Sequence, residues 1–445
     1  MQRLQTSYRA IPAGSPVRLA KPTSNLFRSR VAAGPGLDVS GLTGVLQVDP
    51  ASRTADVAGM CTYENLVAAT LPHGLTPLVV PQLKTITLGG AVSGLGIEAA
   101  SFRNGLPHES VLELDVLTGA GEIVTVTPGD ELFAGFPNSY GTLGYATRVR
   151  IELEPVRSHV ALRHVRFGEL DELCAAVARI MATRKWDGED VDYLDGVMFS
   201  PTESYLTLGA RTEHNAGRAG NPASDYTGMQ IYYRSIQQRH RDILSTQDYL
   251  WRWDTDWFWC SGAFGVQHPV IRRLWPARLR RSDMYWKIVA LANRFDLENR
   301  WEACRGRPRR ERVIQDVEIP LERTAEFLRW FVEHVGIEPV WLCPLRLRGE
   351  RTWPLYPLEP GRDYVNVGFW SSVPIAPGGT GSDVNRAIER QVDVVGGHKS
   401  LYSDSFYSRE EFDARYGGEH YAALKRRYDP DQRLADLYAK AVRRR

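Results

Sequence analysis

The sequence predicts an α+β fold in which two domains are followed by a C-terminal segment. Its 445 residues exceed the length at which a single hydrophobic core usually suffices. Short strands separated by turns dominate the chain up to residue 155, whereas longer amphipathic helices alternate with strands after residue 156. We therefore expect one domain at residues 1–155, a second at residues 156–395 and the C-terminal segment at residues 396–445.

The predicted elements of the first domain follow the pattern of an α+β domain rather than that of a regular doubly wound sheet. It begins with a predicted hairpin at residues 44–59, where alternating apolar residues flank a turn. A helix is expected at residues 62–74, capped by Thr62 and ended near Gly74. An alternating strand at residues 147–155 closes the domain.

The second domain reads as a separate α+β layer. Its predicted elements are, in order, a helix at residues 167–185, a hairpin at 192–211, a helix at 322–336, and strands at 338–349 and 363–372. The C-terminal segment is expected to be helical, with a break at Asp429-Pro430.

Two glycine-rich stretches in the first domain are the candidate ligand-binding segments. They are TLGGAVSGLGIEA at residues 87–99 and GTLG at residues 141–144, with a predicted strand at residues 111–117 between them. Glycine allows the backbone to approach a ligand closely. Consecutive N–H groups in such loops form anion-binding concavities. Two loops of this kind in one domain suit the pyrophosphate of a dinucleotide.

A Rossmann domain is the competing interpretation of the first stretch. Residues 94–99 match G-x-G-x-x-A, and Asp115 follows at about the spacing of a ribose-binding acid. A Rossmann domain also needs a long helix directly after the glycines, and Gly105 and Pro107 interrupt that segment. This interpretation and that of purely structural glycines are the less favoured alternatives.

The order of the motifs resembles the FAD-binding domain of the vanillyl-alcohol-oxidase-like (PCMH-type) flavoproteins. The stretch at residues 87–99 is most similar to that of the delta-24 sterol reductases (Diminuto type) and related lipid alkene reductases. WLCP at residues 341–344 and LYSDSFYSREEF at residues 401–412 add to the resemblance. It implies a two-subdomain PCMH-type FAD domain, an α+β cap domain for the substrate, and a C-terminal segment that returns to the flavin.

The resemblance also implies the residues that hold FAD. They are Thr87, Leu88, Gly89, Gly90, Ala91, Val92, Ser93, Gly94, Leu95, Gly96, Ile97, Glu98, Ala99, Ser101, Gly141, Thr142 and Gly144. Ser101 stands where some relatives have His, so we expect noncovalent FAD. Residues 18–30 depart from the family, because they replace its first glycine-rich loop with RLAKPTSNLFRSR.

The activity implied by the resemblance is reduction of a carbon–carbon double bond in a lipid, with NADPH as the electron donor. A methylene-branched fatty acyl chain of a phospholipid and a sterol side chain are the two candidate substrates, and a lipid-modifying methyltransferase is a candidate partner. Tyr402 is the expected proton donor, with Lys399 and His398 in reserve. The alternatives are an alcohol or sugar oxidase or dehydrogenase of the same fold, and a non-enzymatic lipid-binding protein.

The composition of the chain limits the partners, the metal sites and the cellular location that can be expected. A formal net charge of +2 gives no reason to expect nucleic acid. The five Cys are widely spaced, which favours a reducing cytosol and no metal site. No apolar run suggests a signal peptide or a membrane span, so a cytoplasmic location is expected. His73 and His108 lie beside Gly and Pro and are predicted to be surface groups.

Residues 251–312 form a candidate surface for peripheral association with the inner face of the cell membrane. The segment begins with the Trp-rich string WRWDTDWFW, and residues 272–312 hold thirteen Lys or Arg against five Asp or Glu. Trp prefers the bilayer interface, and Arg is attracted to anionic lipid. A solvated basic face is the simpler alternative, and a nucleic-acid patch is the less favoured one.

Overall fold

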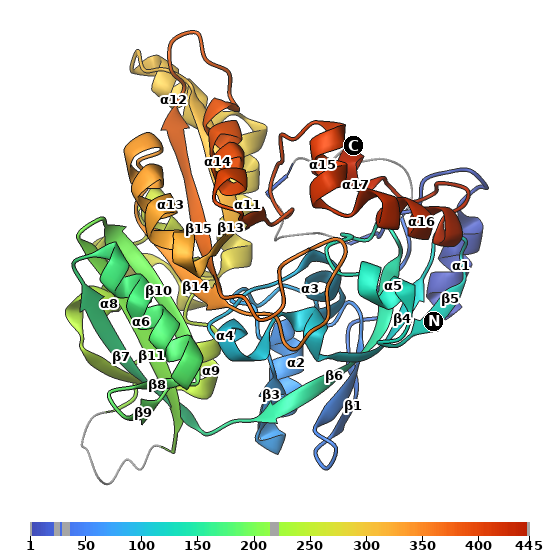
Figure 1. Ribbon diagram of the computed structural model, residues 1–445, viewed down its shortest axis with the longest axis horizontal. Helices are drawn as coiled ribbons and strands as arrows, with labels where there is room; N and C mark the ends of the chain where they lie inside the picture. Colours follow the sequence, from blue (N-terminus) through green and yellow to red (C-terminus); the bar gives the residue numbers. More distant parts are fainter. Residues whose placement is uncertain (1, 22–26, 29–35, 214–221, 443–445) are drawn as a thin grey trace.

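The computed structural model describes residues 2–21, 27–28, 36–213 and 222–442. It contains two antiparallel sheets that lie next to one another, each with its own helices (Figure 1). This architecture confirms the α+β fold class. The change from one sheet to the other falls between the end of β6 at Pro155 and the start of β7 at His159. The division into three units stays a prediction.

The first sheet has the strand order β1-β2-β6-β4-β5, and β3 pairs with β6. Its strands are β1 (Val45–Asp49), β2 (Thr54–Ala58), β3 (Leu75–Pro77), β4 (Val111–Leu117), β5 (Ile123–Val126) and β6 (Tyr145–Pro155). The predicted hairpin is confirmed, since β1 pairs with β2 up to the turn that joins Asp49 to Thr54. All pairings in the sheet are antiparallel, which excludes a Rossmann domain, because that fold requires parallel strands.

The helices of the first domain are short. They are α1 (Gln2–Ala10), α2 (Tyr63–Thr70), α3 (Leu88–Gly94), α4 (Ser101–Asn104) and α5 (Glu131–Gly135), with 3-10 turns η1 (Leu71–His73) and η2 (Pro107–Ser110). The predicted cap of α2 is confirmed, because the Thr62 hydroxyl accepts a hydrogen bond from the Asn65 amide. Gly74 ends this helical region with a φ of 66°.

The second sheet has the order β12-β7-β11-β10-β14-β15-β13-β16. Its strands are β7 (His159–Phe167), β10 (Tyr193–Ser200), β11 (Glu203–Thr212), β12 (Arg241–Ser245), β13 (Arg310–Pro320), β14 (Val340–Leu345), β15 (Tyr364–Pro374) and β16 (His398–Lys399), while β8 (Lys185–Trp186) and β9 (Glu189–Asp190) form a separate pair. The hairpin expected at residues 192–211 is confirmed by the pairing of β10 with β11.

Helices α6 (Leu170–Thr183), α13 (Leu321–His334) and α14 (Asp383–Val394) cover the outer face of the second sheet (Figure 1). Side chains alternate between the two faces of a strand. Val313, Val317 and Ile319 of β13 accordingly belong to the core beneath these helices. Asp316 and Glu318 therefore point to the opposite face, which we call the inner face because it is turned toward the first domain.

The remaining helices form two groups. Between β11 and β13 lie α8 (Tyr232–Gln238), α9 (Thr246–Leu250), η3 (Cys260–Phe264), α10 (Pro269–Leu274), η4 (Ala277–Leu279), α11 (Ser282–Arg294) and α12 (Leu297–Cys304). The C-terminal segment contains α15 (Arg409–Arg415), α16 (Gly418–Tyr428) and α17 (Leu437–Ala441), which lie beside the first domain (Figure 1). In the described part of the chain, no helix is long and apolar enough to cross a bilayer.

Candidate functional site

The stretch at residues 87–99 is not a simple loop. The helix α3 begins after Thr87, whose hydroxyl accepts a hydrogen bond from the Gly90 amide. The amides of Leu88 and Gly89 donate to backbone carbonyls of the first domain, so they are already satisfied within the fold. The expectation of a loop is wrong for Leu88–Gly94, because the N-cap and these tertiary hydrogen bonds stabilise a helix that a Gly-rich sequence does not favour by itself, whereas residues 95–99 are not helical.

The glycines of this stretch have separate roles. A Cβ on Gly89 would lie 2.6 Å from the Gly59 carbonyl oxygen, so Gly89 is required for close packing. Gly96 lies against Pro81 and Pro107, where a Cβ would be 3.1 Å and 3.3 Å from their Cγ atoms. Gly90 differs, because it is exposed and only the Thr87 side chain lies near the place of its Cβ. Gly90 is thus the glycine at which a ligand could approach the backbone.

The second glycine-rich loop contacts α3 directly. The Tyr140 amide donates to the Ser93 carbonyl, and the Tyr140 ring lies against Gly94. Gly141 and Gly144 have φ values of 77° and 147°, which favour glycine.

Buried polar atoms mark the same loop. The Ser139 Oγ and the Tyr140 Oη have no hydrogen-bond partner among the described residues. Buried polar atoms are nearly always paired in proteins. The two orphaned hydroxyls are therefore consistent with a polar group that binds beside this loop.

Two C-terminal lysines hold the loop in place. Lys425 Nζ donates to the Thr142 carbonyl at 2.8 Å, and Lys440 Nζ donates to the Tyr140 carbonyl at 2.5 Å. The C-terminal segment thus returns to the glycine-rich region of the first domain, although more than 280 residues separate Lys425 from Thr142.

Two cations approach α3 from the segment that departs from the family pattern. Lys21 Nζ lies 3.1 Å from the Thr87 Oγ1, and the Arg28 guanidinium lies 4.4 Å from the centre of the Tyr140 ring. Most of the expected loop at residues 18–30 lies outside the described residues, which include residues 18–21 and 27–28. Positive charge beside a helix N-terminus with an exposed glycine suits a pyrophosphate.

The inner face of the second sheet contributes two carboxyl groups. Asp316 and Glu318 lie close enough to Tyr140 and Tyr402 to influence the pKa values of both phenols. Burial raises the pKa of Asp316 to about 7, and the neighbouring Asn366 partly opposes this shift. Burial also raises the pKa of Glu318 well above its usual range. The proton is thus bound more tightly by Glu318 than by a solvated carboxyl group, and Asp316 is suited to exchange a proton near neutral pH.

Tyr402 lies within electrostatic range of these carboxyl groups. Its hydroxyl accepts a hydrogen bond of 2.9 Å from the Trp370 indole nitrogen, and its ring packs edge-on against Phe27 at 5.8 Å. Burial raises the pKa of Tyr402 well above its usual value, with Asp316 the next largest influence. Thr87, Ser93, Asp316, Trp370 and Tyr402 are all partly exposed.

The two reserve proton donors are less well placed. Lys399 is buried and forms an ion pair of 2.6 Å with Glu389, while donating to the Asp404 carbonyl. His398 packs between the rings of Tyr356 and Tyr416, and burial lowers its pKa to about 3. The burial of the Lys399 and His398 side chains is therefore explained by structural contacts, without a role in proton transfer.

Two further sequence-based expectations need correction. His108 is not a surface group: it is buried against Trp353, and burial lowers its pKa to about 3, whereas His73 is exposed as expected. The Trp-rich string does not face a membrane, because Trp251, Trp253 and Trp257 are buried in the core.

The Trp-rich string instead surrounds a buried ion cluster. Arg252 bonds to Glu98 at 2.8 Å and to Asp195 at 2.9 Å, and the Trp253 indole donates to Asp195. Glu98 is therefore engaged within the protein. Ser101, another expected FAD residue, is buried and accepts a hydrogen bond from the Glu98 amide.

Sequence reasoning missed Lys21, Asp316 and Glu318. Acidic residues at alternate positions of a strand with apolar neighbours, as in VIQDVEIP, are unusual in a buried sheet and could have indicated a polar inner face. No signal in the sequence brings Lys21 to Thr87, because that contact depends on the path of the chain.

Comparisons with known proteins agree with this geometry. Residues 4–127 match the family described as FAD binding domain. The chain is 25% identical to a Delta(24)-sterol reductase of Arabidopsis thaliana over 439 residues, covering 92% of this chain and 77% of the relative. It is 24% identical to the Delta(24)-sterol reductase of Homo sapiens over 418 residues, covering 90% and 76%. Cytokinin dehydrogenase 10 of Oryza sativa subsp. japonica is 32% identical over 187 residues, covering 40% and 33%.

The described residues fit FAD in three respects: an exposed glycine at the start of α3, a lysine beside it, and orphaned hydroxyls in the second loop. The family match over residues 4–127 includes α3 and Lys21. The protein thus carries a PCMH-type FAD-binding domain and is similar over most of its length to the Delta(24)-sterol reductases.

Proposed function

We propose that the protein reduces a carbon–carbon double bond of a lipid, with noncovalently bound FAD and with NADPH as electron donor. The observation that carries the proposal is the arrangement around Tyr402: a phenol that holds its proton, two carboxyl groups with raised pKa values, and a surround of aromatic rings. The similarity to reductases named for a sterol double bond supports the reaction class.

The first domain would hold the cofactor. Lys21, Thr87 and Gly90 lie together at the start of α3 and would bind the pyrophosphate, and the second loop would contact the cofactor through Ser139 and Tyr140. When bound, FAD supplies the hydride-transfer chemistry that amino-acid side chains lack. The protein contributes binding, orientation and exclusion of water.

Tyr402 is the proposed proton donor to the substrate carbon. The Trp370 indole donates to the Tyr402 oxygen, which leaves the phenolic hydrogen available to a substrate on the other side. Its raised pKa keeps it protonated across the physiological range. Asp316 and Glu318 are close enough to influence the pKa of Tyr402, and they are the carboxyl groups that would restore its proton after transfer.

The aromatic surround favours an apolar substrate. Phe27 contacts Trp257 at 5.7 Å, Trp286 at 5.3 Å and Tyr402 at 5.8 Å between ring centroids, so a row of rings leads from α11 to Tyr402. Such a row suits a long hydrocarbon better than a sugar. A methylene-branched fatty acyl chain and a sterol side chain both satisfy this requirement.

Anaerobic mixing of the purified protein with NADPH, NADH and candidate alcohols tests the proposal. Bleaching of the flavin absorbance by NADPH, followed by reoxidation on addition of an unsaturated lipid, is the expected result. Lipid from cells with and without the gene should differ by about two daltons, the mass of the two hydrogens added. Bleaching by an alcohol instead of NADPH, with unchanged lipid, would establish an oxidase or dehydrogenase of the same fold.

A further inference from the structure

We propose that the exposed side chains of α10, α11 and α12, residues 269–304, dock on an anionic lipid bilayer, and we call these side chains the α10–α12 face. The proposal concerns a surface and does not depend on the reaction. Three observations carry it: a concentration of exposed apolar side chains, an excess of exposed cations among them, and the pattern of side chains along α12.

Exposed apolar side chains are concentrated in this segment. Among the residues that the structure describes, ten large apolar side chains are exposed, and the seven between residues 270 and 301 are Val270, Ile271, Leu274, Leu291, Phe295, Leu297 and Trp301. Leu274 is 78% exposed and Trp301 is 58% exposed. Single exposed apolar residues are ordinary, whereas a concentrated group marks an interaction site.

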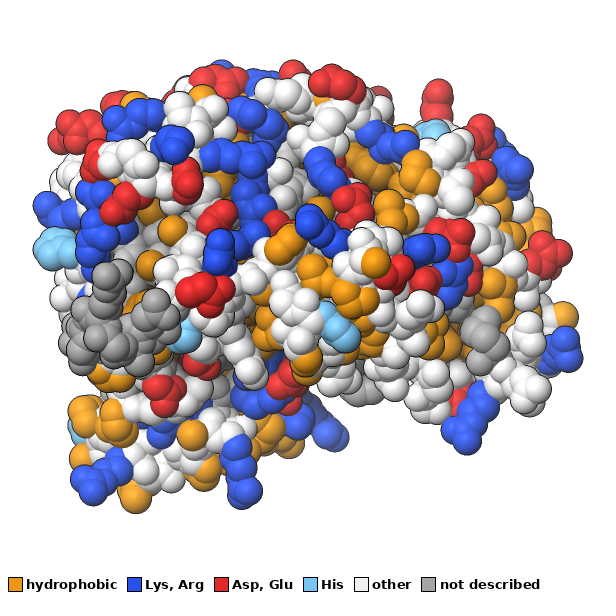
Figure 2. Space-filling model, turned by 90° about the horizontal axis from the view of Figure 1, so that it is seen from below, with side chains coloured by type: hydrophobic (Ala, Val, Ile, Leu, Met, Phe, Trp, Pro, Cys, Tyr) orange, Lys and Arg blue, Asp and Glu red, His pale blue; other side chains and the backbone are white. Residues whose placement is uncertain are grey.

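Cations surround these apolar side chains. Exposed basic residues between 269 and 309 are Arg273, Arg278, Lys287, Arg294, Arg300, Arg305, Arg307 and Arg309, whereas the exposed acidic residues there are Asp296 and Glu298. Figure 2 shows one face of the molecule, on which Lys and Arg side chains are interspersed with Asp and Glu over much of the surface. The partner of the α10–α12 face is therefore expected to be anionic.

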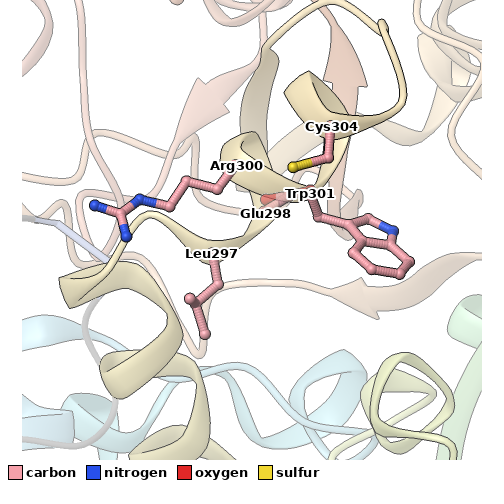
Figure 3. A pocket seen from close by; sticks show the side chains of 5 residues that line it. All are labelled: Leu297, Glu298, Arg300, Trp301 and Cys304. Atoms are coloured by element: carbon pink, nitrogen blue, oxygen red, sulfur yellow. The ribbon is translucent and has the colours of Figure 1, made fainter.

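The helix α12 shows the pattern of an interfacial helix. Leu297, Trp301 and Cys304 are four and three residues apart and share one side of the helix. Together with Glu298 and Arg300 they line a hollow of about 590 Å³ (Figure 3). None of the residues of α12 is buried in the fold. Arg300 extends away from Trp301 in Figure 3, and Arg305 lies 4.2 Å from the Trp301 ring. A Trp flanked by Arg is typical of a bilayer interface.

A bilayer fits this face better than two other anionic or apolar partners. Phosphates of a nucleic acid would pair with the arginines but would leave the exposed Leu and Phe side chains without a contact. A second copy of this chain would bring like charges together across a symmetric contact. A membrane satisfies both features, because headgroups attract the cations and acyl chains receive the apolar side chains.

The α10–α12 face is connected to the candidate site through aromatic side chains. Trp286 belongs to α11, and its ring is joined through Phe27 to Tyr402. A docked molecule would therefore present the row of aromatic rings toward the bilayer. This use rests on the proposed lipid substrate, whereas docking itself does not.

Vesicle sedimentation tests the docking. Full-length protein is mixed with vesicles of phosphatidylcholine alone or of phosphatidylcholine with phosphatidylglycerol. The Arg273→Gln/Arg300→Gln variant should partition about 25-fold less to the anionic vesicles, at roughly fivefold for each charge removed. The matched control is Arg390→Gln/Arg426→Gln, which removes two exposed charges from α14 and α16 and should bind like the unmodified protein.

The apolar contribution is tested separately at raised salt, which screens the charges. Leu274→Ser/Trp301→Ser should abolish the binding that remains, whereas the control Leu46→Ser/Val394→Ser removes two other exposed apolar residues and should not.

Three results would overturn the proposal. They are equal binding to neutral and anionic vesicles at low salt, equal losses in the test and control variants, and a protein dimer that Leu274→Ser/Trp301→Ser dissociates without any vesicle binding. Loss of flavin reduction by NADPH would refute the proposed function and would leave the docking result intact, so the two failures are distinguishable.

Discussion

Replacing Tyr402 by Phe isolates the role of one hydroxyl. The Phe ring keeps the edge-on contact with Phe27, but the Trp370 indole loses its acceptor. Because Trp370 is partly exposed and water can replace the lost acceptor, the change should cost about 0.5–1.5 kcal/mol of unfolding free energy. If the hydroxyl also gives the proton to the substrate, lipid turnover should fall by about 10²–10⁴-fold, the usual contribution of positioned acid catalysis. Flavin content and reduction of the flavin by NADPH should be retained.

Tyr416→Phe is the matched control for this experiment. Tyr416 is buried and donates one hydrogen bond of 2.9 Å, to the Lys399 carbonyl. Its replacement should lower stability to a similar degree without slowing lipid turnover. Turnover, anaerobic flavin reduction and denaturant unfolding are measured for both variants. Normal turnover in Tyr402→Phe, or an equal loss in Tyr416→Phe, would refute Tyr402 as the proton donor.

Three other predictions follow from the site. Burial raises the pKa of Asp316 from 3.8 to about 7, so the folded state binds the Asp316 proton more tightly than the unfolded state does. The protonated carboxyl group therefore contributes to the free energy of unfolding at low pH, and this contribution is lost as the pH rises to about 7. Asp316→Asn should flatten that part of a plot of unfolding free energy against pH, and an unchanged plot would contradict the shift. Gly90→Val should give colourless protein, because the valine side chain would block the exposed start of α3. The control Gly129→Val, at a position where no atom lies within 4 Å of the added Cβ, should stay yellow. If both variants are yellow, Gly90 does not contact the cofactor. Acid precipitation should release FAD into the supernatant, and a yellow pellet would show a covalent bond.

The sequence alone determined the elements whose signals are local. The hairpin of β1 and β2, the Thr62 cap of α2 and the pairing of β10 with β11 follow from alternation, turn residues and capping over a few neighbouring positions. The glycine-rich stretches and their order also identified the FAD-binding domain, because a backbone that must approach a phosphate restricts the residue types along a short segment.

Tertiary structure decided what depends on contacts between distant segments. The Thr87 cap of α3 is local, but the hydrogen bonds of Leu88 and Gly89 to the Cys61 and Gly59 carbonyls depend on neighbours that are not visible at residues 87–99. The carboxyl groups of Asp316 and Glu318 influence the pKa of Tyr402 only because β13 turns its polar side toward the first domain. Two Trp-containing segments likewise differ in burial: the Trp residues at 251–257 lie in the core, whereas Trp301 is exposed to solvent. Local composition cannot distinguish these cases, because burial is set by which segments the fold brings together.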